Sequence, residues 1–382
     1  MAISRRQWLA RSGGWIGGAL WADAIHAQGT PPPAAARRIV LGQSVPLTGA
    51  ASEIGLAFAA GAKLYVDAFN AANPAWRLEL RQMDDGYEAP RAGANALKLL
   101  ADGADLLFGF VGTGSSNAAA AVAQQKGALL FAPFGAADTL RDAAHANVFH
   151  VRPSMADEAY KMVRHCATIG QTRIAVLAED NALGRAGLQA VNDAIAELKL
   201  PPLLGSAFVP ANSTQVDAAA ASLAALQPQV IIQAALFQTT AAAIQAMRKT
   251  GYVGLFMNYS VVGINPLFVA LGKDIRGVVV SQVVPSPRST SVAVVREYNA
   301  AIDNSDQTPT YESLEGFIAA KALAEGVRRT GRAFSVAALQ RALTGMTSYD
   351  VGGFRLNLRA GVRDSAWAID LVTVTADGRV VR

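Results

Sequence analysis

Cysteine is nearly absent from this chain: among 382 residues only Cys166 carries a thiol, so no internal disulfide can form. Long apolar runs are absent too, because no segment approaches the roughly 18 uncharged apolar residues that a membrane-spanning helix needs. Charged residues make up only 16% of the chain, and the basic ones are scattered singly instead of forming a nucleic-acid or lipid-binding patch. We therefore expect a soluble mature protein with no nucleic-acid partner.

The motifs of common enzyme classes are missing as well. No GxSxG nucleophile turn and no GxxxxGK[ST] phosphate loop occurs, and none of the four histidines has metal-ligand spacing with another histidine, a cysteine or an acid. Carboxylates follow predicted strands at Asp84-Asp85 and at Glu179-Asp180, but acids in such places more often cap helices or lie in solvated loops. We predict a binding protein that is not an enzyme and uses no cofactor and no metal.

The N-terminus has the features of an export signal. The segment Ser4-Arg5-Arg6-Gln7-Trp8-Leu9 has the pattern of a twin-arginine signal, and a weakly apolar stretch from Gly13 to Trp21 follows it. Small residues up to Ala27 offer a cleavage site, and residues 28–36, rich in proline and alanine, have the composition of a flexible leader. We expect removal of residues 1–27 and a periplasmic mature protein.

Strands and helices alternate along the rest of the chain. Helices of ten or more residues between strands predict parallel sheets with right-handed crossovers, and two such series in tandem predict an α/β fold of two doubly wound lobes. The expected strands span residues 38–42, 78–83, 106–111, 128–132, 173–178, 205–208, 229–234, 254–257, 278–284, 367–375 and 378–381. The expected helices span residues 54–73, 92–101, 118–126, 157–170, 184–198, 216–226, 239–250, 292–304, 313–330 and 336–343.

The most informative segment is a glycine- and serine-rich loop at residues 112–117, between an expected strand and an expected helix. Backbone N–H groups and small hydroxyls converge there, in the positive field of the helix and at the sheet edge where open α/β sheets bind ligands. The loop therefore predicts an anion site for a carboxylate or a phosphate. It begins like a dinucleotide fingerprint, but Asn117 replaces the third glycine and the first acid, Asp138, lies beyond the next strand.

The order of these motifs resembles the branched-chain amino-acid binding family, the type I periplasmic solute-binding proteins of ABC importers. The resemblance covers residues 38–382 and implies two lobes, joined by three crossovers, that close on a small ligand, with a membrane permease as partner. The matching segments are Gln43 to Gly49, Asp84-Asp85, Gly109 to Ser116, Phe131 to Phe134, Val148 to Arg152, Arg173 to Leu177 with Asp180 and Gly184, and Tyr311 to Ala320.

The resemblance also implies which residues hold the ligand carboxylate. The family's carboxylate-binding hydroxyl falls at Thr113, a position that would equally suit a plain helix N-cap. Family members usually offer a second hydroxyl near Ala136, and this chain has none there. The remaining carboxylate-binding positions implied by the resemblance are Val111, Gly112, Phe134 and Gly135.

Other positions implied by the resemblance form the walls of the pocket. Aliphatic residues stand at Ile54, Leu183 and Leu236, where the family has aromatic ones. Leu183, Leu236 and Phe237 would also suit ordinary packing at the edge of a core, and Tyr311 would also suit a cap of the helix that follows it. The wall positions are Ile54, Leu183, Leu236, Phe237 and Tyr311.

The ammonium-binding end of the implied pocket departs from the family. The family acid that takes the α-ammonium group falls near Ser260, which carries no charge. A buried ammonium without a counter-charge costs several kcal/mol, so we expect an amine-free organic acid to bind better than an α-amino acid. Glu312 or Asp180 could supply the missing charge, which keeps amino acids open as ligands.

The resemblance finally implies the division of the chain into lobes. Residues 37–152 with 285–362 are expected to form lobe 1, and residues 153–284 with 363–382 lobe 2, in a monomer. Two other functions stay open. An exported dinucleotide-dependent oxidoreductase would need a glycine fingerprint near the mature N-terminus, where only Gly42 and Gly49 occur. A sensor that reports to a membrane receptor would use the same clamp as an importer.

Overall fold

The first parallel sheet is built on two long strands, β1 (Arg37–Val45) and β2 (Trp76–Asp84), paired from Arg37 opposite Trp76 to Val45 opposite Asp84. The computed structural model describes residues 36–135, 137–331, 334–358, 369–375 and 379–382. Its strand order here is β2-β1-β3-β4-β5, the order of doubly wound sheets whose switch point lies between β1 and β3. The shorter strands are β3 (Leu106–Phe108), β4 (Leu130–Phe131) and β5 (Val148–Phe149).

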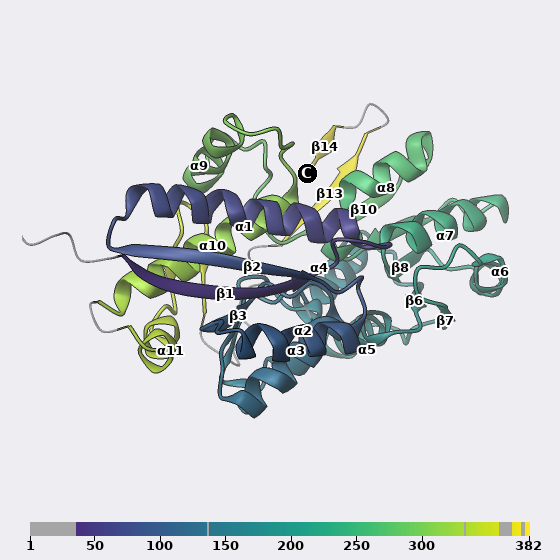
Figure 1. The fold of residues 1–382 in the computed structure, drawn as a ribbon. Helices are drawn as coiled ribbons and strands as arrows, with labels where there is room; N and C mark the ends of the chain where they lie inside the picture. The colour runs from purple at the N-terminus through teal and green to yellow at the C-terminus, as the bar shows by residue number, and fades with distance from the viewer. Residues whose placement is uncertain (1–35, 136, 332–333, 359–368, 376–378) are drawn as a thin grey trace, which may run out of the picture. The chain divides into compact units, whose positions relative to one another are not determined.

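Helices cover both faces of this sheet, which explains why β1 is buried from Ile39 onward. On one face α1 packs on β1 and β2 and is itself covered by α9 and α10, while α2 and α3 pack together on the other face (Figure 1). The helices on the α1 side are α1 (Ser52–Ala72), α9 (Ala293–Ile302) and α10 (Tyr311–Arg329), and α11 (Val336–Thr344) packs against α10. Those on the other side are α2 (Ala89–Ala101) and α3 (Thr113–Lys126).

The second sheet repeats this order and adds two antiparallel strands. Its order is β14-β13-β10-β9-β8-β6-β7, in which β6 to β10 are parallel and β13 pairs antiparallel with β10. The chain thus returns to this sheet at its C-terminal end. The strands are β6 (Ile174–Glu179), β7 (Ser206–Val209), β8 (Val230–Ala234), β9 (Leu255–Asn258), β10 (Val278–Gln282), β13 (Asp370–Val374) and β14 (Val380–Val381).

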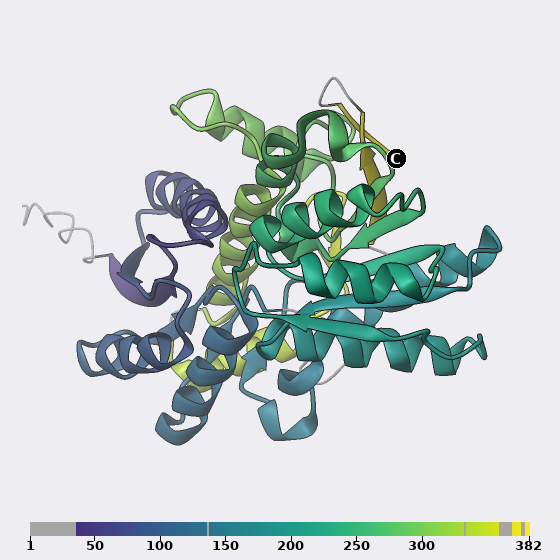
Figure 2. The same cartoon turned by 90° about the vertical axis from the view of Figure 1, so that its right-hand side faces the viewer.

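Helices also pack on the second sheet, and Figure 2 shows helices above and below its strands. The helix α5 packs on β6 and β8 with α4 beside it, and α7 packs against α6 and α8. Their bounds are α4 (Met155–Thr168), α5 (Ala182–Glu197), α6 (Asp217–Ala225), α7 (Phe237–Lys249) and α8 (Ile264–Leu271). A short hairpin joins β11 (Tyr349–Asp350) to β12 (Arg355–Leu356). Within the described residues, no helix is both long and apolar enough to cross a bilayer.

The α/β fold with two largely parallel sheets agrees with the sequence-based prediction, and most elements lie within a few residues of their expected places. One prediction was wrong, and one helix was missed. The segment 112–117, expected as a loop before a helix at Ala118, is helical from Thr113 onward, because Ser115 and Ser116 are buried and packing outweighs weak helix propensity. The helix α8 was not predicted. The export signal, residues 28–35 of the leader and the region around Val362 lie outside the described residues.

Candidate functional site

A pocket lies where the carboxyl ends of the strands of both sheets meet. Its wall comes from segments that follow β1, β2, β3 and β4 of the first sheet and β6, β8 and β9 of the second. Both switch points contribute, which is where doubly wound sheets bind ligands. The lining residues are Ala51, Ile54, Tyr87, Val111, Gly112, Thr113, Phe134, Leu183, Leu236 and Val261.

The polar feature of this pocket is the N-terminus of α3. Gly112 is the N-cap residue with a φ of +104°, and no side chain caps the helix. Thr113 is therefore the first helical residue instead of the N-cap. The N–H groups of Thr113, Gly114 and Ser115 have no intrahelical acceptor, and the first helical bond of the helix runs from Ser116 N–H to the Gly112 carbonyl at 2.8 Å. The N–H and hydroxyl of Thr113, which lines this pocket, can bind an anion here, whereas Gly114 and Ser115 line the cavity beside it.

Tyr87 is a lining residue that sequence reasoning missed. It lies in the turn after β2 at a φ of +68°, an unusual conformation for a bulky side chain. Its N–H donates to Asp85 Oδ1 at 2.9 Å, and Asp85 Oδ2 accepts from the buried Ser44 hydroxyl at 2.8 Å. Burial raises the pKa of both the Asp85 carboxyl and the Tyr87 phenol. The pair of acids at the end of the strand was the available signal, because Asp85 holds the turn that presents Tyr87.

The wall from the second sheet is held by one buried carboxylate. Glu179, at the end of β6, accepts hydrogen bonds from Thr239 Oγ1 at 2.8 Å and from the backbone N–H of Leu236 at 3.3 Å. It also accepts from Asn181 Nδ2 at 2.8 Å and from Asn212 N–H at 3.1 Å. Because Leu236 is the N-cap residue of α7, this carboxylate occupies the N-terminus of that helix. The uncapped helix N-terminus at the pocket is therefore that of α3, which belongs to the first sheet.

A model of the periplasmic binding protein family matches residues 38–378. This chain belongs to that family. The resemblance noted from the sequence is confirmed, and the family agrees with the prediction of a binding protein instead of an enzyme. Among curated proteins, none matches the sequence.

Solved structures of other binding proteins are similar over nearly the whole chain. A possible leucine/isoleucine/valine-binding protein from Rhodopirellula baltica SH 1 is 27% identical with a TM-score of 0.85, covering 92% of this chain and 98% of its own. A substrate-binding periplasmic protein from Ralstonia solanacearum is 29% identical with a TM-score of 0.83, covering 90% and 99%. A fatty acid ABC transporter substrate-binding protein from Thermomonospora curvata has a TM-score of 0.79, covering 90% and 91%, and at 14% identity shows the fold alone.

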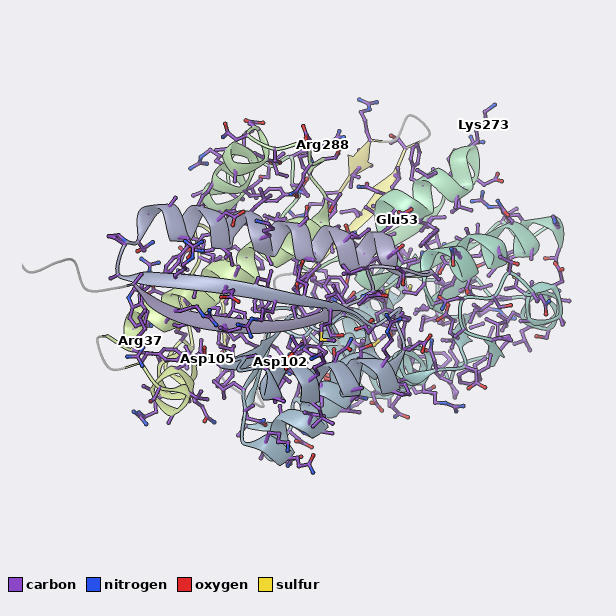
Figure 3. All side chains as sticks on the ribbon, in the orientation of Figure 1. Arg37, Glu53, Asp102, Asp105, Lys273 and Arg288 are labelled. Atoms are coloured by element: carbon purple, nitrogen blue, oxygen red, sulfur yellow. The ribbon has the colours of Figure 1, made fainter. Side chains whose placement is uncertain are left out.

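In this periplasmic binding protein, about half of the positions proposed from the sequence line the pocket. Those positions are Ile54, Val111, Gly112, Thr113, Phe134, Leu183 and Leu236. Gly135 lies directly behind α3, where a Cβ would meet Ser116 Oγ at 2.6 Å. Phe237, Ser260, Tyr311 and Glu312 are not part of the lining, and Ala136 lies outside the described residues. Figure 3 labels Glu53, which precedes the lining residue Ile54 in the first turn of α1. It also labels Arg37, the first residue of β1, at the end of that strand away from the pocket.

Ser260 belongs to a buried ionic network beside the pocket. Its N–H and hydroxyl both donate to Glu158, at 2.7 and 3.0 Å, and Arg152 donates to its hydroxyl oxygen. The Arg152 guanidinium also lies 4.2 Å from the ring centre of the pocket residue Phe134 and 3.6 Å from Glu315. The acid nearest to Ser260 is thus already bonded within the protein. None of the described residues that line the pocket carries a charged side chain.

Two further positions named from the sequence lie away from the lining. Tyr311 begins α10 and is buried, and burial raises the pKa of its phenol. Glu312 follows it, also buried, and burial raises the pKa of its carboxyl. Asp180 pairs with Arg185 at the surface. No group of three or more metal-ligating side chains occurs among the residues that the structure describes.

Proposed function

We propose that this protein captures a small organic carboxylate in the pocket between its two sheets and delivers it to the permease of an ABC importer. The observation that supports the ligand class is the uncapped N-terminus of α3, which faces an otherwise apolar pocket. A charge-assisted hydrogen bond to such donors contributes about 1.5–3 kcal/mol. Family membership supports the transport role.

An amine-free acid suits this pocket better than an α-amino acid. The lining offers no carboxylate, and Glu158 beside Ser260 is already bonded to protein donors. A buried ammonium without a counter-charge costs several kcal/mol. The Rhodopirellula relative is named as a possible leucine/isoleucine/valine-binding protein, so these amino acids are the ligands to compare.

A paired thermal-shift experiment tests the ligand class. Leucine, valine and phenylalanine are each compared with the deaminated acid of the same carbon skeleton, and the acid is expected to stabilise the protein more. Thr113→Val keeps the shape of the side chain and removes its hydroxyl, so acid affinity should fall about ten- to a hundredfold. Thr344→Val, on the exposed surface of α11, is the control that should bind like the wild type.

Two outcomes would contradict separate parts of the proposal. Stronger stabilisation by any of the amino acids would contradict the preference for an amine-free acid. Unchanged acid affinity in Thr113→Val would contradict the carboxylate site at α3.

We further infer a periplasmic monomer whose lobes, residues 37–152 with 285–362 and 153–284 with 363–382, close on the ligand. The separate sheets at 37–149 and 174–282, with β13 returning to the second, support this division. Small-angle scattering should show a smaller radius of gyration at saturating acid. An unchanged radius would contradict closure.

A further inference from the structure

A second cavity, of about 260 Å³, lies directly beside the apolar pocket. Tyr87 and Leu183 line both cavities, so these two side chains form the wall that the cavities share. The other lining residues of the second cavity are Ala89, Gly114, Ser115, Asn181, Ala182, Ala211 and Asn212.

The N-termini of three helices converge on this second cavity. Ala89 and Ala182 are the first residues of α2 and α5, and Gly114 and Ser115 belong to the first turn of α3. The α5 terminus is capped by Asn181, whose Oδ1 accepts from Gly184 N–H at 3.0 Å. The termini of α2 and α3 have no side-chain cap. Uncapped N–H groups and aligned helix dipoles create a positive potential without any lysine or arginine in the lining.

An unpartnered buried hydroxyl points independently to a ligand. Ser115 is 2% exposed, and its Oγ has no hydrogen-bond partner among the described residues. The next residue, Ser116, is equally buried but donates to the Phe110 carbonyl at 3.2 Å. A buried hydroxyl without a partner is costly, so an atom from outside the protein is expected to supply the missing bond.

Two carboxylates lie beside this cavity, and both are bonded within the protein. Glu179 accepts from Asn181 and Asn212, is bonded to four donors and sits at the N-terminus of α7, so its charge offsets the dipole of that helix. Asp85 accepts from the Tyr87 N–H and from the Ser44 hydroxyl just before the start of α2. The N-terminus of α3 has no side-chain cap among the described residues, and its dipole is the one left for a ligand.

We propose that this second cavity is an anion subsite that takes a second carboxylate of the ligand, held by the N–H groups of Gly114 and Ser115 and by the Ser115 hydroxyl. The substrate class is then a dicarboxylic acid with an apolar middle, which passes between Tyr87 and Leu183. This inference rests on the proposed function, since the first carboxylate and the apolar middle occupy the neighbouring pocket.

Calorimetric titration with three acids of one chain length tests the subsite: hexanoate, adipate and the corresponding ω-hydroxy acid. Adipate should bind about tenfold tighter than hexanoate, the factor that one charge-assisted hydrogen bond supplies, and the hydroxy acid should fall between them. Suberate with octanoate repeats the comparison for a longer span. Ser115→Ala should remove most of the diacid preference and leave hexanoate affinity unchanged. Asn117→Ala, on the same helix but outside this cavity, is the control and should keep the preference.

The outcomes separate this subsite from the proposed function. Equal affinity for monoacids and diacids, or a preference that survives Ser115→Ala, overturns the anion subsite and leaves the carboxylate pocket standing. A hydroxy acid that binds as tightly as the diacid also overturns it, because the subsite would then accept a neutral polar group. Failure of every acid to bind overturns the proposed function itself.

Discussion

The ring of Tyr87 lies so close to Gly112 that a Cβ atom on Gly112 would meet Cε2 of the ring at 2.5 Å. This contact joins the turn after β2 to the N-terminus of α3, the two segments that bring polar groups to the pocket. Position 112 therefore requires glycine for two reasons: a Cβ would collide with the Tyr87 ring, and a φ of +104° disfavours any residue with a Cβ.

Gly112→Ala should therefore weaken binding by displacing Tyr87 and by distorting the first turn of α3. We expect acid affinity in calorimetric titration to fall at least about tenfold, the equivalent of one lost charge-assisted hydrogen bond. Gly103→Ala is the matched control: Gly103 has a similar φ of +88°, but the Cβ that alanine adds there would meet no atom of the described residues within 4 Å. It should lose stability and keep its affinity, whereas unchanged affinity in Gly112→Ala would show that the contact does not position Tyr87.

A buried carboxyl on α10 makes stability depend on pH. Burial raises the pKa of Glu315 from 4.5 to about 7, although Arg152, 3.6 Å away, acts in the opposite direction. The protonated form is thus favoured in the folded protein. Its stabilising contribution is fully present below about pH 4.5 and is lost as the pH rises to about 7. Each pKa unit corresponds to 1.36 kcal/mol, so the loss is at most about 3 kcal/mol.

Glu315→Gln should flatten this part of the profile, because glutamine keeps the shape and cannot ionise. Urea unfolding at a series of pH values measures the free energy of unfolding of both proteins, and the wild-type value should fall relative to the variant between about pH 4.5 and 7. Glu325→Gln is the control. It removes a carboxylate of the same helix that pairs with Arg329, and the variant should keep the wild-type profile. A constant difference between wild type and Glu315→Gln would argue against the raised pKa.

The sequence was sufficient for the fold class because strand–helix alternation is a local pattern. Runs such as Val230–Ala234 followed by Phe237–Lys249 specify each unit. The carboxyl edges of parallel strands bring the loops of one sheet together, and the resemblance to the family implied that Val111, Thr113 and Phe134 are neighbours there. Family membership could be recognised from the same segments.

What the sequence could not show depends on conformations and pairings that are not local. Tyr87 reaches the pocket only through a left-handed turn that Asp85 stabilises. The acid pair before Tyr87 signals a turn at the end of the strand, but it does not specify a left-handed conformation at a tyrosine. That Ser260 carries no charge can be read from the sequence. Its hydrogen bonds to Glu158, 102 positions earlier, cannot, because they depend on the fold. The helix α8 was missed because Gly263 and Pro266 surround its start, residues that usually indicate a turn.

Export through the twin-arginine system remains a prediction from Arg5 and Arg6. Replacing both with lysine keeps the charge and removes the motif, so the precursor should accumulate in the cytoplasm. Fractionation and immunoblotting of cells that express the full chain measure the distribution. The same substitution at Arg37 and Arg38, beyond the expected cleavage site, should leave export unchanged. Undiminished export of the Arg5/Arg6 variant would exclude this route.

Alanine substitutions at two helix glycines should have opposite effects on stability, because one glycine lies in a tight helix contact and the other does not. A Cβ on Gly61 of α1 would lie 1.7 Å from the Ser313 carbonyl oxygen of α10, so Gly61→Ala must push the helices apart. Overpacking of this kind costs about 1–3 kcal/mol. In Gly93→Ala on α2, the new Cβ would find only Ala118 Cβ at 3.5 Å, an ordinary contact. Since alanine is the better helix former, this variant should be stabilised by roughly 0.5–1 kcal/mol. Urea unfolding of both variants gives the two signs, and a Gly61→Ala protein as stable as the wild type would show that α1 and α10 can separate without cost.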